Sequence, residues 1–164
     1  MTKSEFLALL SRRLGVTGTH VQSIVNRLHS AGMVAPTRSK RHPPPIDEPD
    51  AVAILLAVLA DRGLEHAADN AWQLAAAHHN GERFSDFVGQ LMFGPPCNVG
   101  HLIIHPSGAS VVIDGQHIEF GERGDVPTRF VPGGVLMAIA AELQGATPRD
   151  ADALAAITRI FNGH

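Results

Sequence analysis

The 164-residue chain contains one cysteine, Cys97, which excludes an internal disulfide and a cysteine-rich zinc site. No run of 18 apolar residues occurs, which argues against a transmembrane helix. The first residues lack the apolar core of a secretory signal, so we expect a cytoplasmic protein without a membrane partner. The composition, 45% hydrophobic and 18% charged, is typical of a globular protein rather than a disordered chain.

Acidic residues are almost missing from the first part of the chain. Residues 1–43 hold seven Lys and Arg against one acid, Glu5, a net charge of +6. Residues 44–164 hold six Arg against fifteen Asp and Glu, a net charge of −9. Such asymmetry is typical of proteins with a nucleic-acid-binding end, although basic residues also gather by chance on a solvated surface.

Known catalytic motifs are missing as well. There is no Gly-x-Ser-x-Gly, no Walker loop and no Gly-x-Gly-x-x-Gly. His101 and His105 fall in a predicted strand, where a spacing of four residues places their Cα atoms roughly 13 Å apart, too far to share a metal ion directly. His117-Ile118-Glu119 is similar to a deaminase His-x-Glu, but the Cys-x-x-Cys that should accompany it is absent. We therefore expect no catalytic residues, no metal, no cofactor and no enzymatic activity.

Two amphipathic helices are predicted at the N-terminus. Thr2-Lys3-Ser4-Glu5 has the pattern of a capping box, and Gly15 stands where a first helix would end. Thr17 or Thr19 can cap a second helix that closes at Gly32. The second helix carries one apolar stripe at positions i, i+3, i+4 and i+7: Val21, Ile24, Val25 and Leu28.

This pair of helices resembles the helix-turn-helix of winged-helix and related bacterial regulators. The resemblance covers residues 3–34 and is carried by the turn Leu14-Gly15-Val16-Thr17 and by the ending Leu28-His29-Ser30-Ala31-Gly32-Met33. It implies a scaffold helix followed by a recognition helix that enters the major groove of DNA. The chain departs from the family where a basic arm, Arg38–Pro45, replaces the wing, and the third helix of the core would be residues 48–61.

The polar face of the second helix offers hydrogen-bonding side chains and no acid. Gln22 and Asn26 can pair with adenine, and Arg27 can contact guanine or a phosphate. The arm can follow the DNA backbone or enter a minor groove. The alternatives are an ordinary solvated helix face and a solubilising linker. The expected DNA-binding residues are Arg12, Arg13, Thr17, Thr19, His20, Gln22, Ser23, Asn26, Arg27, Arg38, Lys40 and Arg41.

The remainder of the chain predicts further helices and a small sheet. A helix that begins at Asp47-Glu48-Pro49-Asp50 is apolar almost all round and should be buried. Two more helices are expected over residues 64–79 and 84–93, and another two follow Pro132 and Thr147. Asp114-Gly115 is a strong hairpin signal within a three-stranded antiparallel meander of residues 101–120. The predicted fold class is mainly α with a small antiparallel β-meander (α+β).

These patterns divide the chain into three segments. Residues 1–35 form the helix-turn-helix, residues 36–46 the basic proline-rich arm, and residues 47–164 an acidic α+β body that we expect to fold by itself. We predict a sequence-specific transcription regulator of bacterial or phage origin that binds double-stranded DNA. Its body would form a homo-oligomer or meet a protein partner. The alternatives are a phage packaging protein similar to a small terminase subunit, and a small enzyme or protein-interaction module on the body.

Overall fold

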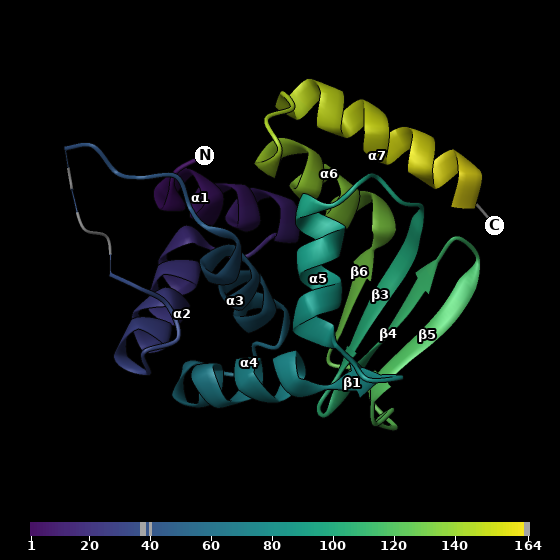
Figure 1. Ribbon diagram of the computed structural model, residues 1–164, viewed down its shortest axis with the longest axis horizontal. Coiled ribbons are helices and arrows are strands. Elements are labelled where there is room, and N and C mark those ends of the chain that lie inside the picture. The colour runs from purple at the N-terminus through teal and green to yellow at the C-terminus, as the bar shows by residue number, and fades with distance from the viewer. Residues whose placement is uncertain (37–38, 40, 163–164) are drawn as a thin grey trace.

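The computed structural model describes residues 1–36, 39 and 41–162 and has a mixed α+β fold (Figure 1). Its helices are α1 (Lys3–Leu14), α2 (Gly18–Ser30), α3 (Glu48–Leu59), the 3-10 turn η1 (Leu64–His66), α4 (Ala67–Ala76), α5 (Phe84–Phe93), α6 (Gly133–Leu143) and α7 (Pro148–Asn162). Its strands are β1 (His78–His79), β2 (Glu82–Arg83), β3 (Val99–His105), β4 (Gly108–Ile113), β5 (Gln116–Gly121) and β6 (Arg129–Pro132). None of the described helices is both long and apolar enough to cross a membrane.

The main sheet has four antiparallel strands in the order β5-β4-β3-β6. The predicted meander corresponds to β3, β4 and β5, and the turn at Asp114-Gly115 joins the last two with φ angles of 48° and 77°, as a tight hairpin requires. The sequence prediction missed the fourth strand, β6. This strand has four residues, ends in a proline and pairs with β3 at the sheet edge, where a proline does not interrupt the hydrogen bonding.

The predicted helix ends at the N-terminus are confirmed. The Thr2 hydroxyl accepts a hydrogen bond from Glu5 N–H at 3.3 Å, and Glu5 Oε2 accepts one from Thr2 N–H at 2.7 Å. Gly15 ends α1 with a φ of 65°, a conformation that glycine adopts without strain. Of the two threonines considered for the second cap, Thr17 accepts from His20 N–H.

The predicted helix over residues 64–79 is shorter in the structure. It starts as η1, continues as α4 and ends at Ala76, and His78–His79 then forms β1. Strand β1 pairs with β2 across Asn80-Gly81, where both residues have positive φ angles of 49° and 87°. The Asn-Gly turn therefore closes a second, two-stranded sheet that helical periodicity did not predict.

One hydrophobic core joins the N-terminal helices to the rest of the chain. Helix α3 is buried almost all round, as predicted, and α2 packs on α3 and α4 while α1 packs on α3 and α6. The same cluster of buried side chains contains Phe6 and Leu28 from the first two helices, Leu55 from α3 and Phe84 from α5. The first 35 residues therefore share one hydrophobic core with the rest of the chain.

The sheet covers the other side of this core. Phe120 of β5 lies with its ring centroid 5.1 Å from those of Phe84 and Phe87 in α5. Helix α6 starts directly after β6 and packs against β3, and α7 lies outside α6 (Figure 1). At Gly133 a Cβ would stand 1.7 Å from the Val99 carbonyl oxygen, so only glycine lets α6 begin so close to β3.

Candidate nucleic-acid interface

Helix α2 lies at one end of the molecule with its inner face on α3 and α4 (Figure 1). All four residues of the predicted apolar stripe are buried, from Val21 at the first turn to Leu28 at the last. The hydroxyl of Thr17 caps the N-terminus. The inner stripe and the cap fix the rotation of the helix, and with it the side chains that face solvent.

The outer face of α2 presents polar side chains. Thr19, Gln22, Asn26 and Arg27 are exposed, and the helix contains no Asp or Glu. Gln22 Nε2 donates to Asn26 Oδ1 at 3.1 Å, so these two amides lie next to each other one turn apart. Ser23 is half-buried and donates its hydroxyl hydrogen to the Thr19 carbonyl of its own helix at 2.9 Å. Within the described part of the chain, no hydrogen bond is found to the Gln22 oxygen or from the Asn26 amide nitrogen, so both can meet a ligand.

His20 points away from this face and toward the loop that follows α3. Its Nε2 lies 2.6 Å from Asp61 Oδ2, and Gly63 N–H donates to the other oxygen of Asp61 at 3.0 Å. Burial acts to raise the pKa of Asp61, but the hydrogen bonds from His20 and Gly63 outweigh it and hold that pKa below its ordinary value. His20 therefore ties α2 to the loop that follows α3.

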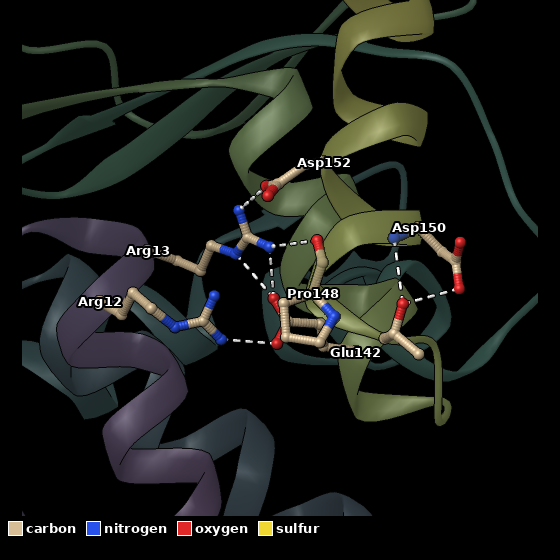
Figure 2. A network of polar contacts seen from close by, with 7 residues as sticks. Arg12, Arg13, Glu142, Pro148, Asp150 and Asp152 are labelled. Atoms are coloured by element: carbon tan, nitrogen blue, oxygen red, sulfur yellow. Dashed lines mark hydrogen bonds and ion pairs between the residues drawn. The ribbon is translucent and has the colours of Figure 1, made fainter.

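Arg12 and Arg13, at the end of α1, form an ion-pair network with α6 and α7 (Figure 2). Arg12 Nη2 lies 2.6 Å from Glu142 Oε2, and Arg13 Nε donates to Glu142 Oε1 at 2.7 Å. Arg13 also pairs with Asp152 and donates to the Pro148 carbonyl at 3.3 Å. Burial acts to lower the pKa of Arg13, and the bonds to Asp152 and Glu142 raise it above its ordinary value. Both arginines hold α1 against the C-terminal helices.

The basic arm leaves the end of α2 and returns to the N-terminus, where Ile46 N–H donates to the Met1 carbonyl at 3.0 Å. Lys3 Nζ lies 2.8 Å from Asp50 Oδ2 and donates to the Ala35 carbonyl at 2.6 Å, which fixes the point where the arm leaves. Arg41 is exposed, and no ion pair of it is found within the described part of the chain. Two other predicted DNA-binding residues, Arg38 and Lys40, lie outside the described residues.

A groove of about 860 Å³ lies between α3, α4 and the start of α5. It was not predicted from the sequence. Val52 and Leu56 belong to its apolar lining, and the Trp72 side chain borders it with 66% of its surface exposed. The buried residues of α4 include Ala67 and Leu74 at helical spacing, and Trp72 is off that stripe, a signal that was present in the sequence.

Two histidines of the main sheet belong to a polar network that runs from the buried His105 to the exposed His117. His105 Nε2 lies 3.0 Å from Ser110 Oγ, which in turn donates to Glu119, and His117 Nε2 lies 3.0 Å from Glu119 Oε1. Ser110 is only 1% exposed, so its hydroxyl is not accessible to a substrate. The network instead connects neighbouring strands of the sheet. Across residues 1–36, 39 and 41–162, no group of three His, Cys, Asp or Glu side chains is arranged to hold a metal ion. Burial raises the pKa of the half-buried Cys97 thiol, which disfavours a reactive thiolate.

Comparison with known proteins gave no match: no family model fits the chain, and no curated protein or solved structure is significantly similar to it. The function must therefore be inferred from the geometry of the chain itself.

Proposed function

We propose that the protein binds double-stranded DNA through the outer face of α2 and acts as a sequence-specific transcription regulator of bacterial or phage origin. The observation that carries this proposal is the exposed Gln22–Asn26 amide pair on a helix without acids, held by a fully buried inner stripe. Amide side chains read adenine through paired donors and acceptors in the major groove, which admits one α-helix. The rigid inner face gives these amides a fixed position, which base readout requires.

The charges of the N-terminal region divide into two groups. Lys3, Arg12 and Arg13 are paired with acids of this chain and serve to hold the fold together. The basic residues left to contact phosphate are therefore Arg27 on the outer face of α2 and those of the arm. Arg41 of the arm is exposed, and the arm also contains Arg38 and Lys40. Four phosphate contacts give a modest affinity that decreases steeply with salt.

The proposal is tested by fluorescence anisotropy with a labelled DNA duplex of random sequence. Asn26→Glu places a negative charge on the outer face and should weaken binding at least about tenfold, because it repels phosphate. Arg27→Ala should flatten the log–log salt slope by about 0.9. The matched control is Gln73→Glu, a change of an exposed residue on α4 that leaves affinity unchanged. Binding that is absent in the wild type, or equal in Asn26→Glu, excludes α2 as the interface.

A second candidate function is the binding of a basic protein segment in the groove next to Trp72. Three acids, Glu48, Asp69 and Asp86, line this groove together with its apolar residues. An apolar floor beside an exposed indole and negative charge fits an amphipathic helix that carries Lys or Arg next to its apolar stripe.

Trp72 gives a direct test of this second candidate, because it is the single tryptophan of the chain. Titration with a synthetic helical peptide of Leu and Lys should shift the tryptophan emission to the blue as the indole is covered. Asp69→Asn with Asp86→Asn should weaken that response, whereas Asp125→Asn, a change of an exposed acid outside the groove, should not. Emission that stays constant through the titration removes this candidate.

A further inference from the structure

Helix α7 has two apolar faces, and only one of them is covered. Ala151 is buried and Leu154 half-buried where the helix packs on α6. On the outer face a second stripe repeats at i, i+3, i+4 and i+7, and all four of its residues are exposed: Ala153, Ala156, Ile157 and Ile160. Ile157 is 50% and Ile160 is 77% exposed. Large apolar side chains at this spacing are typical of a helix that packs on another helix.

The charges beside the stripe are self-complementary. Asp152 and Arg159 stand seven residues apart, so they lie two turns apart on the same flank of the outer stripe. When two copies of such a helix pack antiparallel about a two-fold axis, equivalent flanks meet. The N-terminal acid of one copy then approaches the C-terminal base of the other, and the contact occurs twice. Asp152 already pairs with Arg13, but 63% of its side chain remains exposed and can accept further hydrogen bonds.

The surface next to α7 has room for the side chains of a partner helix. One hollow of about 290 Å³ borders Ile157 and is lined by Cys97 and Met137. Another, of about 420 Å³, borders Ala156 and Arg159 on the opposite flank. Helix α7 lies far from α2 along the molecule (Figure 1), so a contact here leaves the outer face of α2 open.

We propose that the outer face of α7 binds α7 of a second copy of this chain, antiparallel, to form a two-fold symmetric dimer. Ala153 of one copy lies opposite Ile160 of the other, and Ala156 lies opposite Ile157. The contact comes from one helix of 15 residues, about 22 Å long, so the dimer is weaker than a standard interface of about 1,600 Å². Dissociation in the micromolar range is expected. The proposal does not depend on DNA binding.

Sedimentation velocity over a micromolar concentration series, without DNA, tests the dimer. Wild type should shift from monomer to dimer as the concentration rises. Ile160→Lys should raise the dissociation constant on the order of 100-fold, because each substitution removes the same contact twice. Val126→Lys replaces another exposed apolar residue, 72% exposed, and should leave the equilibrium unchanged. A wild type that stays monomeric or forms larger rings, or a dimer that Ile160→Lys does not weaken, overturns the proposal.

Cross-linking tests the orientation. In a Cys97→Ser background, Ala153→Cys combined with Ile160→Cys should form a disulfide-linked dimer under mild oxidation, because cysteines two turns apart on one helix are too distant to bond within a copy. Ala153→Cys alone should form no covalent link, because its antiparallel neighbour is residue 160 of the other copy. Circular dichroism confirms that each variant is folded. Efficient cross-linking of Ala153→Cys alone indicates a parallel pair and contradicts the proposed symmetry.

Discussion

Helices α2 and α7 each bury one side and leave the other to solvent, yet they differ on both sides. The inner face of α2 buries large residues such as Ile24 and Leu28, whereas the buried side chains of α7 within residues 148–160 are the smaller Ala151 and Thr158. Outside, α2 is polar and free of acids, and α7 presents two isoleucines. The inner face determines how much of the fold depends on a helix, and the outer face determines which class of partner the helix can meet.

Deleting each end of the chain tests the first half of this comparison and has the largest expected effect. The sequence predicted that residues 47–164 fold alone, but the shared core leads us to expect the opposite. Residues 1–43 include eight buried apolar side chains between Phe6 and Val34, each worth about 1.5–3 kcal/mol, against a net stability of about 5–15 kcal/mol. A chain without them should show no cooperative thermal transition by circular dichroism.

Deletion of residues 148–164 is the matched truncation. Because the fully buried side chains in residues 148–160 are the small Ala151 and Thr158, this shorter chain should keep a cooperative transition at a lower temperature. If instead the chain without residues 1–43 melts cooperatively and the chain without α7 does not, the roles of the two ends are reversed.

Single substitutions on the inner faces of α2 and α7 should rank in the same order as the two deletions, with smaller losses of stability. Leu28→Ala leaves a cavity at a fully buried site and should lower the free energy of unfolding by about 2–5 kcal/mol. Leu154→Ala, at a half-buried site on α7, should cost about 1 kcal/mol. Urea denaturation of the two variants gives both values, and equal costs would mean that α7 is as much a part of the core as α2.

Glu142 connects the two ends, and its removal should have an intermediate effect. The carboxylate is 6% exposed and pairs with Arg12 and Arg13 (Figure 2). Glu142→Gln leaves both arginines without that charge and should cost about 1–3 kcal/mol, less than a fully buried pair because Arg12 is half exposed. The exposed Glu65→Gln serves as the control in the same urea titration and should change stability by less than about 0.5 kcal/mol. Matching losses in both variants would show that the network adds nothing.

The smallest effect is expected at the His20–Asp61 contact. Because the pKa of Asp61 is lower in the folded protein than its ordinary value of about 3.9, the carboxylate stabilises the native state above that pH. This contribution disappears as the pH falls further and the carboxylate is protonated. Asp61→Asn should therefore be less stable than wild type at neutral pH, and the difference in the free energy of unfolding should shrink as the pH falls below the ordinary pKa of Asp. A difference that does not change with pH would assign the effect to packing rather than to charge.

Local patterns predicted much of this fold. The capping box at Thr2, the glycine end of α1, the apolar stripe of α2 and the Asp114-Gly115 hairpin all follow from neighbours within a few residues, and the structure confirms them. Strand β6 could not be predicted from local patterns, because a four-residue edge strand with a proline depends on its pairing with β3 rather than on its own sequence.

For the candidate interface too, only local features could be predicted from the sequence. The spacing of Gln22 and Asn26 placed them on an outer face, because helical periodicity is local. The partners of Arg12 and Arg13 are about 130 residues away in α6 and α7, and no local signal reveals them. A buried acid within an otherwise apolar helix, as Glu142 is in α6, indicates a basic partner but does not identify it.

Selection of binding sites from random duplex DNA tests the central claim most directly. Wild type should enrich one motif, and Gln22→Ala and Asn26→Ala should each lose preference at one base pair by about 5- to 150-fold, the equivalent of about 1–3 kcal/mol for a paired amide contact. The exposed Gln73→Ala on α4 should enrich the wild-type motif. If wild type enriches no motif, or both α2 variants enrich the same motif equally well, α2 does not read DNA.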